Sequence, residues 1–359
     1  MKWVLLVVTI VLAAAVAALA WLVVVYPTQP PPTGPVRTVA LQLQPQLSLD
    51  AAAEQLARAG LVKQPRVFAL YARVLGAQKR LRSGQVLVTS QMTIRHLLQR
   101  IAEGYGSTPL LITIPEGWTQ FDVAQRLAEW GVCDSGTFLQ TIAPGAADAS
   151  APAVGAAPRG EGYLFPDTYW LRDGMHADQV IAKLSDNAQR RMNKLFAAEP
   201  AALARLHADF GYGQSEIVVL ASIVEKEAHV PEEQPMIAGV FLNRLRDPSF
   251  HPKRLQADPT VAYGCLLHRE LPSCSTFDGR RVTRTMTADP QNPYNTYRIE
   301  GLPPTPIANP GISALRAVLH PAEHSYLYFV ARGDGHHTFS ANLEAHNLAT
   351  RLAVNPGVP

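Results

Sequence analysis

The strongest hydrophobic pattern of the chain lies at its N-terminus. Thr9 is the only residue between Trp3 and Tyr26 that is not apolar. A helix over this run would be roughly 36 Å long at about 1.5 Å per residue, enough to cross a hydrocarbon layer of about 30 Å. The pattern therefore predicts a cytoplasmic stub and a single transmembrane anchor over residues 1–26.

A cleaved signal peptide is the alternative, because the small residues Ala18 and Ala20 resemble a cleavage site. The apolar run continues through Tyr26, beyond the usual apolar core of a signal peptide, and this favours a retained anchor. Lys2 is the only charged side chain before the span. The N-terminus is therefore expected in the cytosol, and the rest of the chain on the other side of the membrane.

Two stretches beyond the anchor repeat one pattern at an offset of about 70 residues. Each has a short apolar strand that ends before a proline, Pro45 or Pro115. Each continues with a helical pattern that ends at a glycine, Gly60 or Gly131, and with a second helix.

These patterns divide the chain into predicted segments. Residues 27–35 are rich in proline and predict a stiff, extended linker. Residues 36–106 predict a small α+β module whose order of a strand, two helices and a strand resembles a LysM-type glycan-binding domain; a structural spacer is the alternative. Residues 107–359 predict a larger α+β domain, in which the Ala-, Gly- and Pro-rich residues 143–160 form a flexible insertion without chemistry.

The composition agrees with packed domains and excludes several classes of protein. Because 47% of the residues are hydrophobic and 17% are charged, the chain is not disordered, collagen-like or a disulfide scaffold. The formal net charge of +3 argues against a dedicated nucleic-acid binder.

A helical pattern near Ser215, a predicted N-cap, carries the first candidate for chemistry. Its apolar residues predict one buried stripe: Ile217, Leu220, Ala221, Val224 and Ala228. Glu225 lies beside this stripe, where lost solvation would raise its pKa toward that of a general acid. Glu227 falls on the opposite flank, so the two glutamates are not expected to act as a pair. A solvated helix edge is the alternative for both.

Polar and aromatic residues also gather in loops on either side of this helix. Glu161 to Tyr169 combines aromatic rings with carboxylates, which suits either a sugar site or a loop packed onto the core. The next predicted helix carries Asn243, and the proline-pinned loops after it hold the other candidates for substrate binding: Gln256, Asp258, Tyr294, Asn295 and Tyr297.

Four motifs together resemble the YceG-like family, the endolytic murein transglycosylases, over nearly the whole chain. They are Ala221-Ser-Ile-Val-Glu-Lys-Glu227, Leu255-Gln-Ala-Asp-Pro-Thr260, Tyr294-Asn-Thr-Tyr297 and Gly301-Leu-Pro-Pro304. The resemblance implies that Glu225, the first glutamate of its motif, is the catalytic acid. It also implies an enzyme of the inner membrane with a periplasmic catalytic domain, penicillin-binding synthases as partners, and no cofactor.

The implied reaction cleaves peptidoglycan between N-acetylmuramic acid and N-acetylglucosamine, with termination of nascent glycan strands as its role. One carboxyl group protonates the leaving oxygen and then deprotonates the sugar's own 6-hydroxyl, which closes a 1,6-anhydro ring. Hydrolysis needs a second carboxylate, and Asp258 keeps a muramidase as an alternative. A non-catalytic peptidoglycan-binding scaffold is the other alternative.

Histidines and cysteines change this picture little. The histidines of the C-terminal part have no H-E-x-x-H arrangement, so no metal site is expected. Between Tyr263 and Pro293 the chain departs from the family pattern, and there Cys265 and Cys274 could form a disulfide outside the cytosol. Cys133 is expected to be a buried, small apolar residue.

Overall fold

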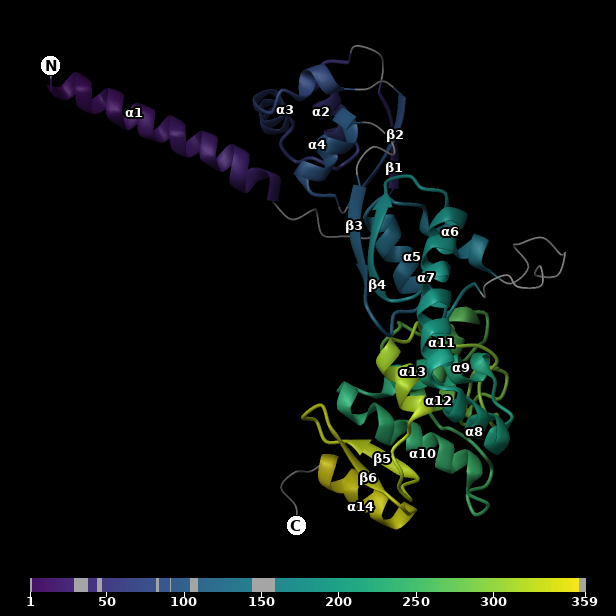
Figure 1. Cartoon of the computed structure of the whole chain (residues 1–359). Helices are drawn as coiled ribbons and strands as arrows, with labels where there is room; N and C mark the ends of the chain where they lie inside the picture. The colour runs from purple at the N-terminus through teal and green to yellow at the C-terminus, as the bar shows by residue number, and fades with distance from the viewer. Residues whose placement is uncertain are drawn as a thin grey trace. The chain divides into compact units, whose positions relative to one another are not determined.

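The computed structural model describes residues 2–28, 38–43, 47–81, 84–90, 92–103, 109–143 and 159–354. Helices and short strands are both present, and a long run of helices separates β4 (Asp167–Arg172) from β5 (Tyr328–Ala331), in agreement with the predicted α+β class (Figure 1). Most of the predicted linker over residues 27–35 and of the predicted insertion over residues 143–160 lies outside the described residues.

Contacts divide the chain into two compact units, and neither is continuous in sequence. Unit 1 comprises Met1–Ile112, Phe121–Ala146 and Thr168–Val180, and unit 2 comprises Thr113–Gln120, Ala147–Asp167 and Ile181–Pro359. The units therefore interleave along the chain, whereas the predicted segments are continuous.

The N-terminal run is helical in the structure. Helix α1 (Lys2–Ala20) is followed by a π-helical turn, η1 (Trp21–Val25), and a 3-10 turn, η2 (Tyr26–Thr28). Within the described part of the chain, no helix combines the length and apolar character that a membrane crossing requires.

The predicted internal repeat is confirmed in unit 1. Both copies have the order strand, helix, helix, strand, and the two strands of each copy pair with each other. The first copy consists of β1 (Thr38–Leu43), α2 (Leu49–Arg58), α3 (Pro65–Val74) and β2 (Gly84–Thr89), with the turn η3 (Ala77–Arg80) before β2 and α4 (Ile94–Glu103) after it. The second consists of β3 (Pro109–Ile114), α5 (Gln120–Glu129), α6 (Ser135–Ile142) and β4 (Asp167–Arg172). Strands β1 and β2 are antiparallel, with Thr38 opposite Thr89.

The two predicted helix-ending glycines have the same backbone geometry. Gly60 and Gly131 have φ angles of +72° and +66°, a left-handed conformation that glycine adopts without the steric cost of a Cβ atom. The N–H of each donates to the carbonyl three residues earlier, on Ala57 or Ala128, at 2.9 Å. Each glycine thus ends its helix and turns the chain toward the next one.

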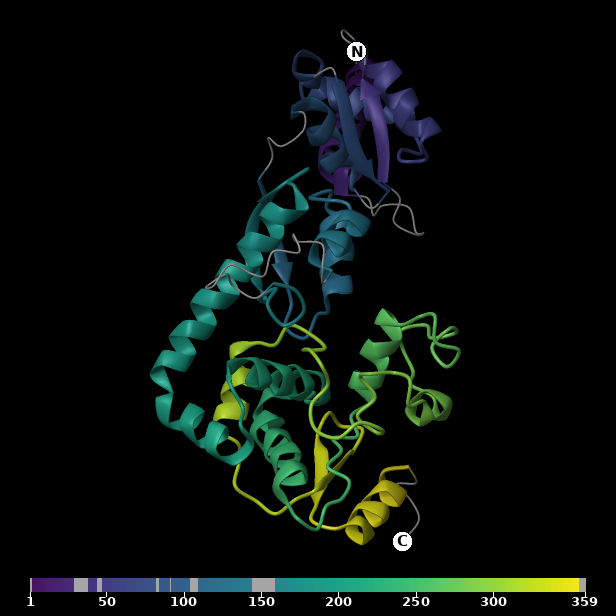
Figure 2. The same cartoon turned by 90° about the vertical axis from the view of Figure 1, so that its right-hand side faces the viewer.

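Helices dominate unit 2, and its long central helix α9 (Gln214–Glu227) carries the candidate glutamates. The other helices here are α7 (Ala177–Ala198), α8 (Pro200–Phe210), η4 (Pro231–Glu233), α10 (Gln234–Arg246), α11 (Asp258–Leu267), α12 (Arg284–Ala288) and α13 (Ile312–Leu319). Helices α9, α10 and α13 pack against one another, and α14 (Leu343–Val354) packs on the antiparallel hairpin of β5 (Tyr328–Ala331) and β6 (His337–Ser340) (Figure 2).

Two expectations for α9 are wrong in detail. Every residue from Ile217 to Val224 is buried, so the predicted single stripe is too narrow, because α10, α11 and α13 all pack against this helix. The predicted N-cap Ser215 lies inside the helix. Gly213 caps it instead, and its N–H donates to the side chain of Glu216 at 2.8 Å.

A small hydrophobic cluster surrounds a disulfide between Cys265 and Cys274. Val261, Phe277 and Met286 complete the buried part of this cluster. Cys133 is a free thiol, half-buried where full burial was expected.

The disulfide gives the first testable prediction. Thiol labelling of the denatured, unreduced protein should modify Cys133 alone, and prior reduction should add Cys265 and Cys274. Because the closed loop is short, replacing both bonded cysteines with alanine should lower the free energy of unfolding by about 2–3 kcal/mol at most. Equal labelling of all three thiols before reduction would contradict the bond.

Candidate functional site

A cavity of about 550 Å³ in unit 2 brings together several of the predicted site residues. Gln256, Asp258 and Tyr297 line it, as does Glu227 at the C-terminal end of α9. The remaining lining comes mainly from α10, from the β5–β6 hairpin and from α14. Residues far apart in sequence therefore converge on one space that is large enough for a ligand.

Two of the sequence motifs are joined to each other at the edge of this cavity. The carbonyl of Thr296 accepts a hydrogen bond from the Gln256 N–H at 3.1 Å, and the Thr296 hydroxyl accepts one from the Ala257 N–H at 3.0 Å. The Tyr297 hydroxyl donates to Asp258 Oδ1 at 2.7 Å. The Tyr294-Asn-Thr-Tyr297 motif thus holds the Leu255-Gln-Ala-Asp-Pro-Thr260 motif in place.

Gln256 has a backbone conformation that is rare for its residue type. Its φ angle is +54°, in the left-handed region that side chains with a Cβ atom seldom adopt. The two hydrogen bonds that Thr296 accepts hold the chain in this conformation, which is a form of local strain that clusters at functional sites.

Glu227 has the electrostatic properties of a general acid. Burial raises its pKa to about 7, the negative charge of Asp258 adds to this rise, and the Arg244 guanidinium opposes it. A carboxyl group with this pKa is in part protonated at neutral pH and can donate a proton to a bound substrate.

Arg244 is a buried cation next to the cavity. Its side chain is 6% exposed, and its Nε donates to the Leu327 carbonyl at 2.6 Å while its Nη1 donates to the Leu255 carbonyl. Four aromatic rings lie 5.6–5.9 Å from the guanidinium carbon, those of Phe241, Phe250, Tyr328 and Phe329. Burial lowers its pKa to about 10, so the side chain stays charged at neutral pH.

Glu225 lies outside the lining of this cavity. Its Oε2 accepts a hydrogen bond from the Gly311 N–H at 3.1 Å, in the loop of Asn309-Pro-Gly311. Burial raises its pKa, and the nearby Glu116 carboxylate adds to the rise, while the Gly311 hydrogen bond and Lys226 oppose it. Both glutamates of the motif are thus perturbed, but Glu227 is the one that lines the cavity with Asp258.

Three predicted substrate-binding residues hold loops in place instead of lining the cavity. The Asn243 Nδ2 donates to the carbonyls of His324 and Tyr326 at 2.7 and 3.1 Å. Asn295 is fully buried, and its Nδ2 donates to three carbonyls, the shortest bond being 2.6 Å to Asp289. The Tyr294 hydroxyl pairs with Thr305 at 2.7 Å. Their polar atoms are used within the protein.

The aromatic-rich segment after Glu161 is likewise a packing element. Phe165 and Tyr169 are buried, and so is the Glu161 carboxylate. One oxygen of Glu161 accepts from Asn309 Nδ2 at 2.9 Å, and the other accepts from the Gln120 N–H at 2.8 Å. Of the two readings of this segment, the loop packed onto the core describes the structure.

Sequence reasoning did not single out Arg244 or His229 of the cavity lining, and it considered His337 and His346 only as possible metal ligands. His337 Nδ1 lies 2.7 Å from Glu233. Within the residues that the structure describes, no group of three or more His, Cys, Asp or Glu side chains is arranged to hold a metal ion. The sequence did offer a signal for Arg244, because it is a charged residue on the largely apolar helix α10. Charged residues are seldom fully buried unless they are paired.

Comparisons with known proteins connect this geometry to a family. A model of the YceG-like family matches residues 41–351. The endolytic murein transglycosylase of Bacillus subtilis (strain 168) is 27% identical over 331 residues, which cover 89% of this chain and 85% of that protein. That of Streptococcus pneumoniae serotype 2 (strain D39) is 26% identical, and the match covers 84% of this chain but 55% of that longer protein.

A solved structure supports the same relationship. A crystal structure of a yceG-like protein from Listeria monocytogenes shares 25% sequence identity with this chain and superposes with a TM-score of 0.56. The superposition covers 87% of this chain and 98% of the other. Since the family model spans most of the sequence and the fold agrees, the chain belongs to the YceG-like family.

Proposed function

We propose that this chain is a lytic transglycosylase that cleaves peptidoglycan strands between N-acetylmuramic acid and N-acetylglucosamine. The enzyme class follows from the family and from the endolytic murein transglycosylases to which the chain is similar. The observation that carries the proposal is the cavity itself, where Glu227, with a pKa of about 7, faces the charge of Asp258.

In the first step, Glu227 donates its proton to the oxygen that leaves the muramic acid. The bond from C1 to that oxygen breaks, and positive charge develops on the muramic acid ring. The Asp258 carboxylate stabilises this charge, as it also keeps Glu227 protonated beforehand.

In the second step, the Glu227 carboxylate takes a proton from the 6-hydroxyl of the same sugar. The 6-oxygen then bonds to C1 and closes a 1,6-anhydro ring, and Glu227 is again protonated. One carboxyl group serves as acid and then as base, and no water is consumed.

Two variants distinguish Glu227 from Glu225 as the catalytic acid. The family resemblance assigns the reaction to Glu225, whereas the geometry favours Glu227. Glu227→Gln should reduce strand cleavage at least about 10²-fold, since it removes the proton that is donated. Glu225→Gln keeps the side-chain shape and should retain most of the activity. Both variants should be assayed on the same purified glycan, with anhydro-muramic ends counted.

Stability measurements show whether the Glu227→Gln variant is folded. Burial raises the pKa of Glu227 from its ordinary value of 4.5 to about 7, so the folded state binds this proton more tightly than the unfolded state does. Wild-type stability should fall as the pH rises from about 4.5 through about 7, and Glu227→Gln should lack this dependence. An inactive Glu225→Gln beside an active Glu227→Gln would overturn the assignment.

The pH dependence of cleavage tests the pairing of Glu227 with Asp258. Because the donor must be protonated, the rate should fall as the pH rises above about 7. Asp258→Asn removes the negative charge that raises the pKa of Glu227, so the midpoint of this fall should move to lower pH. An unchanged midpoint in Asp258→Asn would show that Glu227 does not limit the rate.

The alternatives give different products. A hydrolytic muramidase, with Asp258 as the second carboxylate, releases reducing ends, whereas a lytic transglycosylase leaves anhydro-muramic ends. A scaffold of the wall-synthesis machinery releases neither. Mass spectrometry of products from purified sacculi distinguishes all three.

We further propose that the apolar run from Trp3 to Tyr26 anchors the enzyme in the inner membrane, with its catalytic unit in the periplasm. From there it would end nascent glycan strands beside penicillin-binding synthases. The unbroken apolar sequence supports this proposal. The protein should fractionate with the inner membrane and keep its original N-terminus, and a mature chain that begins at Trp21 would contradict the anchor.

A further inference from the structure

The end of the N-terminal apolar run is built into the core of the first repeat copy in unit 1. The turns η1 and η2 pack against helices α3 and α4. Leu22 and Tyr26 of these turns are 6% and 2% exposed, and they belong to the same hydrophobic cluster as Tyr71 of α3. The rings of Tyr26 and Tyr71 are 5.9 Å apart and meet edge to face. The core of this copy therefore begins within the apolar run itself.

The exposed side of helix α3 continues this junction with further apolar side chains. Leu70, Val74 and Leu75 are 49%, 46% and 43% exposed, and we call these three residues the α3 patch. At about 100° per residue, Val74 lies about 60° and Leu70 about 100° around the helix from Tyr71, which meets the apolar run. Apolar side chains gathered outside a core mark a surface that binds a partner or a membrane.

The charges beside the α3 patch are positive. Helix α3 carries two arginines and no acidic residue. Arg73 pairs with Asp50, whereas Arg66 is exposed four residues before Leu70. Helix α4 adds Arg95, which is also exposed. Arginines next to an apolar surface suit a bilayer, because the apolar side chains enter the lipid while the guanidinium groups stay among the headgroups.

A cavity of about 340 Å³ lies between the apolar run and the two helices. Val23 of the run lines one side of it, and the other side is lined mainly by Tyr71, Leu75 and Leu98. Among the described residues that line it, Arg95 is the only charged one. Because Val23 belongs to the segment that we propose to cross the membrane, lipid can reach this cavity. An apolar lining with one arginine matches the acyl chain and the phosphate of a phospholipid.

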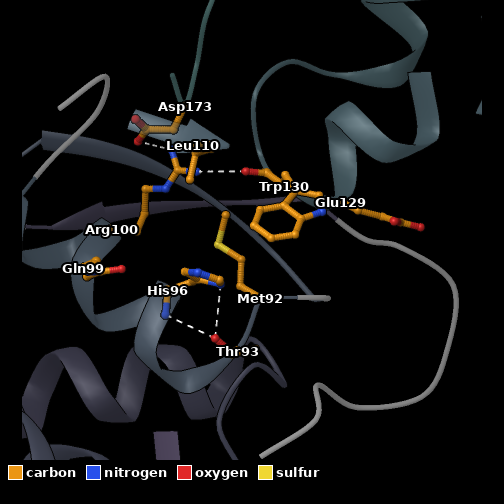
Figure 3. Close-up of a pocket in the computed structure, with 9 residues that line it drawn as sticks. All are labelled: Met92, Thr93, His96, Gln99, Arg100, Leu110, Glu129, Trp130 and Asp173. Atoms are coloured by element: carbon orange, nitrogen blue, oxygen red, sulfur yellow. Dashed lines mark hydrogen bonds and ion pairs between the residues drawn. The ribbon is translucent and has the colours of Figure 1, made fainter. Parts of the chain in front are cut away.

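Helix α4 presents Arg95 to this cavity because another of its faces is tied to the second repeat copy. Figure 3 shows His96 and Arg100 of α4 beside Trp130 and Asp173. Arg100 and Asp173 form a buried ion pair, and the rings of His96 and Trp130 are 5.5 Å apart. These contacts fix the rotation of α4 about its own axis, and they leave Arg95 on the side of the apolar run.

We propose that the first repeat copy lies on the membrane surface, with the α3 patch in the lipid and the phosphate of an anionic phospholipid paired with Arg95. The proposal rests on the membrane anchor proposed above, because the anchor holds this copy at the bilayer. The first repeat copy is then part of the membrane attachment, and the bilayer fixes its orientation.

Spin labels test the contact in the full chain, reconstituted in vesicles of phosphatidylethanolamine and phosphatidylglycerol. Leu70→Cys and Leu111→Cys form a matched pair, because Leu70 is 49% exposed and Leu111, on β3, is 50% exposed. Both variants also carry Cys133→Ala, which removes the free thiol. The label at position 70 should collide more often with oxygen, which concentrates in lipid, than with a water-soluble nickel chelate. The label at position 111 should show the reverse.

Lipid selectivity tests the role of Arg95. The preference of the chain for phosphatidylglycerol over phosphatidylcholine is measured from the lipid retained after purification in detergent. This preference should fall about fivefold in Arg95→Gln, the effect of one basic residue near an anionic surface. Arg172→Gln removes another exposed arginine of the same unit, at the end of β4, and should keep the wild-type preference.

Flotation of the chain with the vesicles separates this proposal from that of the anchor. A chain that does not float overturns both. A chain that floats while the label at position 70 meets the nickel chelate as often as the label at position 111 retains the anchor and overturns the docking surface. An unchanged lipid preference in Arg95→Gln overturns the docking surface as well. Leu70 and Arg95 are exposed, so neither substitution disturbs the core.

Discussion

The buried charge of Arg244 is the constraint on which the candidate active site depends. A guanidinium removed from water is costly unless partners surround it. Here the partners come from three directions: carbonyls of Leu255 and Leu327, a group of aromatic rings, and the acidic side chain of Glu227. Satisfying one cation thus fixes helix α10, the segment before α11 and the C-terminal hairpin around the same cavity.

The same arrangement explains why the carboxyl group of Glu227 can have a pKa near 7. Asp258 raises the pKa of Glu227 and Arg244 lowers it, while burial dominates both. Without Arg244, Glu227 would be more firmly protonated and a poorer base in the second step. Without Asp258, it would ionise more readily and be a poorer acid in the first. Asp258 and Arg244 together keep the pKa of Glu227 between these limits. A group that acts first as an acid and then as a base needs such an intermediate pKa.

Local patterns in the sequence predicted the repeat of unit 1, down to Gly60 and Gly131, because helix ends are set by residues within one or two turns. They also marked Gln256, Asp258 and Tyr297 as candidates, and all three line the cavity of unit 2. They did not show which face of α9 meets the cavity. A helical pattern gives the angle between Glu225 and Glu227, but the neighbours that cover each face come from α10, α11 and α13, which long-range packing brings together. The same limit hid Arg244, and nothing local reveals that the amides of Asn243 and Asn295 donate to carbonyls of other segments.

The hydrogen-bond network of Glu161 and Asn309 has a consequence for how the protein is made. Asn309 bonds to Trp118, Leu164 and Glu161, across sequence separations of 191, 145 and 148 residues. These bonds can form only after the ribosome has added Asn309. Until then the Glu161 carboxylate, the Trp118 carbonyl and the Leu164 N–H lack these hydrogen bonds. Pairings this distant slow folding and lengthen the time during which apolar surface is exposed. Helix α9, whose residues from Ile217 to Val224 are all buried in the folded protein, is therefore an element of unit 2 that needs protection until synthesis is complete.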